Sequence, residues 1–246
     1  MPETGIPQLK RHFKSAAPGL YALCSATKRR TRQLLHDYLV KDQKIRFREI
    51  YRTCGWGSEG ESASGPGSSL AQTALIRNAI PSLIKEYGIT SMLDIPCGDF
   101  WWARHMELER CRYIGADIVE ELVLSNSRNY GGRLREFCVR DLTQDRLPTS
   151  DLVLCRDCLI HLSFRDINKA LANIKASGSK YLLTTTFTDR PANLNTITGG
   201  FRPLNLQIAP FDFPNPICVI NEGYELEGGT ARDKSLGFWR IDELPA

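Results

Sequence analysis

The sequence of 246 residues contains no apolar run close to the roughly 20 residues that a membrane-spanning helix needs. We therefore do not expect a protein with membrane-spanning helices. Its N-terminus also lacks the basic-then-apolar order of a secretory signal. With 42% hydrophobic and 24% charged residues, the composition is that of an ordinary globular domain. We therefore expect a protein of the cytoplasm.

The sequence also lacks a disulfide framework and a second cluster of metal ligands. Several of its eight cysteines, including Cys138, Cys155 and Cys218, stand inside apolar runs, as small buried hydrophobic residues do. Cys155 and Cys158 form a CxxC pair followed by His161, but a structural zinc site needs four ligands and no other cluster supplies the rest. We expect no bound metal ion.

Basic residues are concentrated at the N-terminus. Up to residue 40, seven Lys and Arg residues accompany only two acidic residues, in a chain whose net charge is +4. We assign residues 1–45 to a basic extension and prefer a solvated segment as its interpretation. Contact of this extension with an anionic membrane surface, nucleic acid or an acidic partner is the alternative. A nucleic-acid enzyme would carry basic residues throughout its catalytic domain, so we expect no nucleic-acid partner.

Short apolar runs alternate with helical patterns over residues 46–246, the predicted catalytic domain. A helical pattern ends at Tyr87 before Gly88, with Ser68 or Ser69 as its cap and with Pro81 expected to kink or divide it. Another helix begins at Ser163 with a sequence like a capping box. The five runs expected to form strands in this region are residues 92–95, 113–116, 136–139, 152–155 and 181–185.

The C-terminal part departs from this alternation. Residues 217–220 and 236–241 read as two further strands without a convincing helix between them, which is typical of an antiparallel hairpin. The strands before them, separated by helices, indicate a parallel sheet covered on both faces. The sequence therefore predicts an α/β fold.

The segment from Ser91 to Asp117 has the layout of a nucleoside-binding site. A strand enters a turn at Gly98, and a second strand ends in Asp117, at the spacing where an acid accepts ribose hydroxyls. Pro96 and Phe100 flank this single glycine, so the backbone has little freedom to cradle a pyrophosphate. A ligand without phosphates, such as S-adenosylmethionine, fits this layout better.

Three segments together resemble the successive motifs of class I S-adenosylmethionine-dependent methyltransferases: residues 93–100, 113–118 and 151–162. The Asp-Ile-Pro-Cys-Gly-Asp turn differs from the usual glycine-rich form and marks a subgroup. The resemblance spans roughly residues 50–244 and implies a Rossmann-like, seven-stranded, mostly parallel sheet with a C-terminal antiparallel hairpin and helices on both faces. Residues 46–88 would form an N-terminal lid and helix, and residues 186–216 an insertion beside the acceptor.

The cofactor implied by this resemblance is S-adenosyl-L-methionine. We expect Asp117 on the ribose rather than as a helix cap, and Asp141 on the adenine amino group rather than only in a turn. Asp94 and Asp99 are assigned to the methionine ammonium, with loop support or helix capping as the alternative. The predicted cofactor-binding residues are Asp94, Pro96, Cys97, Gly98, Asp99, Asp117, Ile118, Asp141, Leu142 and Arg156.

Arg156, Asp157 and His161 follow the fourth expected strand and are the predicted catalytic residues. Charges that end a buried strand lie at the carboxyl edge of the sheet, where α/β proteins bind ligands. His161 is the best candidate for a general base because the imidazole pKa suits that task, and a structural histidine is the alternative. Asp157 would receive a substrate hydroxyl, with Arg156 fixing it or binding an acidic substrate group.

The acceptor pocket is expected between the lid and the long polar segment 186–216, because such excursions are more often functional than idle. Its predicted residues are Trp56, Ser64, Trp102 and Arg202, with core packing as the alternative for Trp102. Aromatic and amide groups suit a small or glycan-like hydroxylated acceptor. We therefore predict an O-methyltransferase; an N-methyltransferase or a noncatalytic S-adenosylmethionine-binding module is the alternative.

Overall fold

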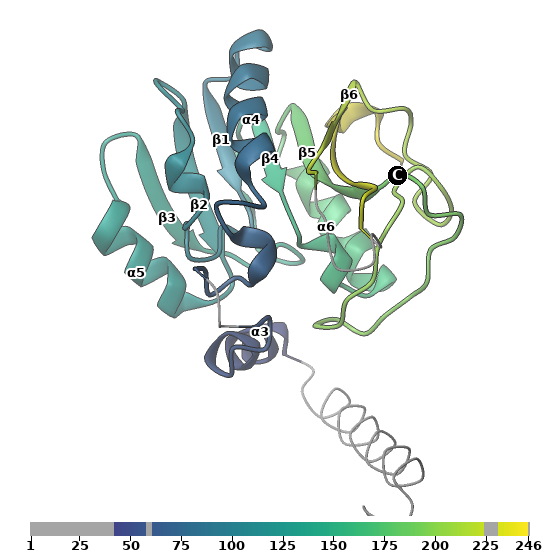
Figure 1. Cartoon of the computed structure of the whole chain (residues 1–246), viewed down its shortest axis with the longest axis horizontal. Helices are drawn as coiled ribbons and strands as arrows, with labels where there is room; N and C mark the ends of the chain where they lie inside the picture. Colours follow the sequence, from purple (N-terminus) through teal and green to yellow (C-terminus); the bar gives the residue numbers. More distant parts are fainter. Residues whose placement is uncertain (1–41, 58–60, 224–230, 246) are drawn as a thin grey trace, which may run out of the picture. The chain divides into compact units, whose positions relative to one another are not determined.

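The structure, a computed structural model, describes residues 42–57, 61–223 and 231–245 (Figure 1). Residues from Lys44 onward form one compact unit. The predicted basic extension lies almost entirely outside the described residues, so its interpretation stays a prediction. Within the described part of the chain, no helix is both long enough and apolar enough to cross a membrane.

One seven-stranded sheet organises the molecule, with the strand order β3-β2-β1-β4-β5-β7-β6. The first five strands pair in parallel, whereas β7 is antiparallel to both of its neighbours, β5 and β6. The strands are β1 (Ser91–Asp94), β2 (Arg112–Asp117), β3 (Arg135–Val139), β4 (Leu152–Cys155), β5 (Tyr181–Phe187), β6 (Cys218–Asn221) and β7 (Lys234–Arg240). The predicted mostly parallel sheet with an antiparallel C-terminal pair is confirmed.

Helices cover both faces of this sheet (Figure 1), as predicted. One apolar cluster joins Ile80 to Met92 and Leu154, and the other joins Ile167 to Leu93 and Val153. Neighbouring residues of one strand enter different clusters because successive side chains point to opposite faces. The helices are α3 (Gln43–Arg52), α4 (Ala74–Glu86), α5 (Glu120–Tyr130) and α6 (Phe164–Ala176).

The start of α4 differs from the prediction. The helix begins at Ala74, after Thr73, whose hydroxyl donates to the Ser69 carbonyl and does not cap the helix, whereas Ser68 ends a short 3-10 helix, Pro66–Ser68. Pro81 does not divide α4, which continues to Glu86. A proline inside a helix costs about 3 kcal/mol, but each buried aliphatic side chain contributes about 1.5–3 kcal/mol, and α4 buries four of them against the sheet.

The predicted cap of α6 is confirmed. The Ser163 hydroxyl accepts a hydrogen bond from the Asp166 backbone N–H at 3.2 Å and donates one to the Asp166 carboxylate at 3.0 Å. The helix then buries Ile167, Ala170 and Ile174. This fixed start also sets the position of the residues just before it, including the 3-10 turn Leu159–His161.

The sheet order reverses between β1 and β4, because β1 leads to β2 on one side while β4 leads to β5 on the other. In open α/β sheets a crevice forms at the carboxyl ends of the strands at such a point, and ligands bind there. The candidate site is therefore expected at the ends of β1, β2 and β4.

Candidate functional site

The turn after β1 is tied to the end of β2 by the Asp117 carboxylate. One carboxylate oxygen accepts a hydrogen bond from the Gly98 N–H at 3.0 Å, and the other accepts one from the Val119 N–H at 2.9 Å. Asn126 of α5 donates to the Gly98 carbonyl at 2.8 Å and holds the turn from the far side. The acid and the glycine that the sequence singled out thus lie side by side at the switch point.

Buried carboxylates surround this turn. Burial raises the pKa of Asp117 to about 6, even though backbone N–H groups oppose the shift. Burial also raises the pKa of Asp94 to about 7, against the hydroxyl of Tyr113, which donates to that carboxylate, and the charge of Arg156. A ligand that carries positive charge or donates hydrogen bonds would stabilise the ionised form of these carboxylates.

The other predicted cofactor residues lie at or near this turn. Pro96 follows a cis peptide bond and is half-buried, as is Ile118, which follows Asp117. Cys97 is buried, and its N–H donates to the Ala116 carbonyl of β2 at 2.8 Å. These contacts extend the sheet by one step and fix the direction in which the turn leaves β1.

Asp141 is buried just beyond β3, and its carboxylate accepts hydrogen bonds from residues of the turn that follows. One of its oxygens accepts hydrogen bonds from the Thr143 N–H at 2.8 Å and the Thr143 hydroxyl at 2.7 Å, and the other accepts one from the Gln144 side chain at 2.8 Å. The turn role that the sequence left open is therefore present. Leu142 beside it is buried, and the predicted adenine contacts of both residues stay predictions.

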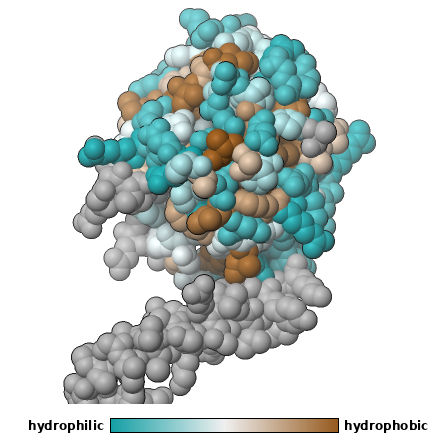
Figure 2. Space-filling view, turned by 90° about the vertical axis from the view of Figure 1, so that its right-hand side faces the viewer, coloured by the Kyte–Doolittle hydropathy of each residue, from teal (hydrophilic) through white to brown (hydrophobic). Residues whose placement is uncertain are grey.

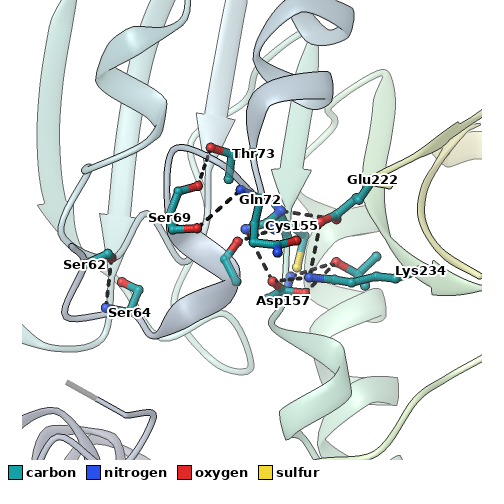
Figure 3. Close-up of polar contacts among 12 residues, drawn as sticks. Ser62, Ser64, Ser69, Gln72, Thr73, Cys155, Asp157, Glu222 and Lys234 are labelled. Carbon is teal, nitrogen blue, oxygen red and sulfur yellow. Dashed lines mark hydrogen bonds and ion pairs between the residues drawn. The ribbon is translucent and has the colours of Figure 1, made fainter. Parts of the chain in front are cut away.

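Residues 61–69, which we call the strap, run across the carboxyl ends of the strands (Figure 3). At one end, the Asp99 carboxylate accepts hydrogen bonds from the Ser62 hydroxyl at 2.9 Å and from the Ala63 N–H at 2.8 Å. At the other end, the Gly67 carbonyl accepts one from Arg156 at 2.8 Å. The strap thus joins the turn after β1 to the end of β4.

The structure places Ser64 against the Gly98 turn, and its predicted contact with an acceptor stays a prediction. A side chain at Gly98 would lie 2.2 Å from the Ser64 hydroxyl oxygen, so the two residues are in direct contact. Gly98 itself has a φ of +54°, a conformation that glycine adopts readily. The close approach of the strap thus adds a second reason for glycine at this position.

Beyond β4, four charged side chains form a buried network. Arg156 donates to both carboxylate oxygens of Glu222, at 2.7 and 3.2 Å, and lies 3.3 Å from one oxygen of Asp157. Lys234 lies 2.7 Å from that same oxygen of Asp157 and 3.2 Å from Glu222. Two cations and two anions therefore neutralise one another, which buried charges require. Figure 3 shows Asp157, Glu222 and Lys234 converging from three parts of the chain.

The sequence prediction missed Glu222 and Lys234. Glu222 follows β6 and Lys234 begins β7, and the antiparallel register brings them together through a backbone hydrogen bond from the Glu222 N–H to the Lys234 carbonyl at 3.0 Å. The only signal in the sequence was a lysine directly before an apolar strand. Its partners are at least ten positions away along the chain, and no local pattern identifies them.

Asp157 is the most exposed member of this network, since 25% of its side chain is accessible to solvent. Burial would raise the pKa of Asp157, but the charges of Arg156 and Lys234 outweigh that effect and hold the pKa well below its usual range. Both cations contact the same oxygen, whereas the other oxygen contacts the Thr185 hydroxyl at 3.3 Å. Asp157 is an ionised hydrogen-bond acceptor and a very weak base.

His161 lies in the 3-10 turn before α6, between two aromatic rings. Its Nδ1 atom is 2.7 Å from the Gly200 carbonyl oxygen, which can only accept, so Nδ1 carries the proton and Nε2 has the free lone pair. The ring centroids of Trp56 and Phe201 lie 4.1 and 5.8 Å from that of His161. Burial lowers the pKa of His161, although the Gly200 carbonyl and Asp157 oppose the shift. The imidazole is therefore neutral at pH 7.

The segment between β5 and β6 packs against His161 at residues 199–202. Arg202 is buried, and its guanidinium donates to the carbonyls of Leu194, Leu159 and Leu162. The side chain thus holds the segment to the turn that carries His161, and its predicted contact with an acceptor stays a prediction. The same segment exposes Leu194, Ile197 and Phe201. The face of the molecule in Figure 2 combines hydrophilic residues with separate small apolar groups.

The tryptophans predicted near the acceptor differ in their surroundings. Trp56 is half-buried and contacts His161, whereas Trp102 is 6% exposed and belongs to the apolar cluster beneath α4. The Arg156 guanidinium lies 5.3 Å from the centre of the Trp102 ring, within the range of a cation–π contact. Core packing, the alternative considered for Trp102, describes its position. Among the described residues, no three His, Cys, Asp or Glu side chains are grouped so that they could hold a metal ion.

No protein-family model matches this chain, and no curated protein matches it. Solved structures do. The N-methyltransferase NodS from Bradyrhizobium japonicum is 13% identical with a TM-score of 0.51, and the match covers 72% of this chain and 98% of NodS. The 1,6-didemethyltoxoflavin-N1-methyltransferase from Burkholderia thailandensis, solved with S-adenosylhomocysteine, is 18% identical with a TM-score of 0.50, over 68% of this chain and 78% of that one.

Human N-acetylserotonin methyltransferase also matches, at 17% identity and a TM-score of 0.45, over 73% of this chain. The match spans 59% of the human chain, less than two thirds of its length. The likenesses to NodS and to the 1,6-didemethyltoxoflavin-N1-methyltransferase show that this chain has the class I methyltransferase fold.

Proposed function

We propose that this protein is an S-adenosylmethionine-dependent methyltransferase that methylates a hydroxyl group of a small or glycan-like acceptor. The observation that carries the proposal is the pairing of Asp117 with the Gly98 turn at the switch point of the sheet. This is where a fold of this class binds its ligand, and a carboxylate there can accept hydrogen bonds from both ribose hydroxyls.

The residues present fit this cofactor. Asp94, Asp99, Asp117 and Asp141 give the site an acidic lining, and burial has raised the pKa values of Asp94 and Asp117. Such a lining suits a ligand with a positively charged sulfur and an ammonium group better than one with phosphates. Asp117 would hold the ribose, and the turn around Gly98 would face the methionine end. Bound S-adenosylmethionine supplies a methyl group on a sulfonium, which is an electrophile.

His161 is the proposed general base. A neutral hydroxyl becomes a good nucleophile only as its proton leaves, and a positioned base contributes roughly 10²–10⁴-fold to such a step. The Nε2 atom of His161 has a free lone pair because Nδ1 carries the proton toward Gly200. Nε2 would take the proton of the acceptor hydroxyl as that oxygen displaces the sulfur at the methyl carbon, which would leave S-adenosylhomocysteine as the second product. The nearby carboxylate of Asp157 favours the imidazolium that forms.

Asp157 is the proposed acceptor-binding residue, and its low pKa argues against a role as the base. Its less engaged oxygen is available for a hydroxyl donor of the acceptor. This division of roles, with one ionised carboxylate for binding and one neutral imidazole for proton transfer, supports a hydroxylated acceptor. The ionised carboxylate would also attract an ammonium group, so an amine acceptor is the second candidate.

The first experiment is a calorimetric titration of the full chain with S-adenosylmethionine and S-adenosylhomocysteine. We expect dissociation constants in the micromolar range for both. The transfer of a labelled methyl group to panels of hydroxylated and amine-bearing small molecules and glycans then tests the acceptor class. An absence of binding to either ligand at millimolar concentration would overturn the cofactor assignment, and binding without transfer to any acceptor would favour a noncatalytic module.

A further inference from the structure

Ser64 occupies an unusual position in the strap. Its hydroxyl oxygen lies against the bare face of Gly98, close enough that a Cβ atom on Gly98 would be 2.2 Å from it. The Ser64 residue is half-buried rather than buried. A hydroxyl group is thereby presented at the one turn of the fold where the methionine end of the cofactor is expected.

The hydrogen bonds of the Ser64 hydroxyl are long. It lies 3.5 Å from an oxygen of the Asp99 carboxylate and accepts from the Asp99 N–H at 3.4 Å. Hydroxyl hydrogen bonds have a usual length of about 2.7–2.8 Å. The Ser64 O–H and the Asp99 N–H are therefore two donors with weak partners, next to each other at the same turn.

The neighbouring residues hold the strap in place without Ser64. The Ser62 hydroxyl lies 2.9 Å from both oxygens of Asp99, and the Ala63 N–H is 2.8 Å from one of them. Glu61 accepts hydrogen bonds from the Leu70 N–H at 3.0 Å and the Trp101 side chain at 3.2 Å. The Ser64 hydroxyl thus makes only long hydrogen bonds to the turn and contributes little to fixing the strap, which leaves this hydroxyl for a ligand.

We propose that the Ser64 hydroxyl and the Asp99 N–H together bind the carboxylate of the methionine end of the cofactor. Two adjacent donors match the two oxygens of a carboxylate. Hydrogen bonds from these donors to a charged ligand group would be stronger than the long hydrogen bonds that Ser64 and Asp99 make with each other. The inference rests on the proposed function and assigns the strap to cofactor recognition. Ser64 is then a residue that selects a ligand with a free carboxylate.

The test compares S-adenosylmethionine with its decarboxylated analogue, which keeps the sulfonium and the ammonium but lacks the carboxylate. Affinities of both ligands are measured by calorimetry for the wild-type chain and for Ser64→Ala. We expect Ser64→Ala to weaken S-adenosylmethionine binding about ten- to a hundredfold, as for a lost hydrogen bond to a charged group. Binding of the analogue should change by less than about twofold.

Two further variants control this comparison. Ser82→Ala removes a hydroxyl from the exposed side of α4, where it donates to the Asn78 carbonyl, and should change neither affinity. Ser64→Thr keeps the hydroxyl and should restore the preference for S-adenosylmethionine. Thermal melting of each variant shows whether it is folded, and the threonine variant keeps the test informative if the alanine variant is not.

Equal weakening of both ligands by Ser64→Ala, or no weakening of S-adenosylmethionine, would overturn the assignment of Ser64. Failure of the wild-type chain to bind either ligand would instead overturn the proposed function. The two failures are therefore distinguishable.

Discussion

The two sides of the site bury carboxylates in opposite ways. On the proposed cofactor side, Asp117 is hydrogen-bonded to backbone N–H groups, and burial raises its pKa to about 6. On the proposed acceptor side, Asp157 is only partly buried and lies against Arg156 and Lys234, whose charges outweigh desolvation and hold its pKa well below the usual range. Partial charges of amides are therefore too weak to offset desolvation here, whereas two full positive charges exceed it.

This difference separates the functions of the two regions. A carboxylate with a raised pKa becomes fully charged when a cationic or hydrogen-bonding ligand arrives, so ligand binding and ionisation are coupled. A carboxylate with a lowered pKa stays ionised near neutral pH, so the acceptor would meet the same negative charge whether or not the cofactor is bound. The predictions below test this division, from the largest expected effect to the smallest.

The largest effect is expected from His161→Ala. The variant should retain its affinity for S-adenosylhomocysteine while methyl transfer to a hydroxylated acceptor slows by roughly 10²–10⁴-fold, because the base is lost. In the wild type the rate should rise with pH through an ionisation below the ordinary imidazole value, since burial lowers the pKa of His161. This limb should be absent from the pH profile of the variant.

His105→Ala is the matched control, because His105 is exposed. It should leave both the rate and its pH dependence unchanged. Loss of cofactor affinity or of folding in His161→Ala, together with a selective rate loss in Asp157→Ala, would make the histidine structural and the carboxylate the base.

The second effect concerns the buried network. Glu222→Ala should lower the free energy of unfolding by about 3–5 kcal/mol, because it removes a buried carboxylate that pairs with both Arg156 and Lys234. Urea denaturation measures this difference. Asp242→Ala, which breaks a salt bridge to Arg240 on the surface, should cost less than about 1 kcal/mol. Equal costs for the two variants would contradict the role given to burial.

The third effect is on cofactor affinity. Asp117→Ala should weaken both S-adenosylmethionine and S-adenosylhomocysteine by about 1.5–3 kcal/mol, the usual value for hydrogen bonds to a charged group. Calorimetry measures the affinity of Asp117→Ala for both ligands, and Asp242→Ala, which alters a surface carboxylate, is the control. An Asp117→Ala variant that binds as tightly as the wild type would show that the ribose lies elsewhere.

The smallest effect is a pH dependence of the same binding. Asp117 has a pKa of about 6, and its carboxylate can accept hydrogen bonds from both ribose hydroxyls only when it is ionised. S-adenosylhomocysteine should therefore bind about tenfold more weakly at pH 5 than at pH 7.5. Calorimetry at pH 6 in buffers of different ionisation enthalpy should detect proton release. Asp94, with a pKa of about 7, faces the same turn, so Asp94→Asn is measured alongside Asp117→Asn. If only Asp94→Asn removes the dependence, the coupling belongs to Asp94.

Most of the fold could be predicted because its signals are local. Each of the seven strands coincides with a predicted apolar run or overlaps it, and the cap of α6 lies where Ser163 predicts it. The start of α4 was wrong by several residues, since serines at 68 and 69 and the threonine at 73 are all suitable caps.

The sequence by itself determined the strands, the turn at Gly98 and the spacing to Asp117, because hydrophobic alternation and turn chemistry act over a few neighbouring residues. Tertiary structure alone decided that Glu222 and Lys234 join the network around Asp157, that Ser64 lies against the Gly98 turn, and that Arg202 holds its own segment. These contacts join residues from distant parts of the chain. Their partners are set by strand order and register, which depend on the whole sheet rather than on any one segment.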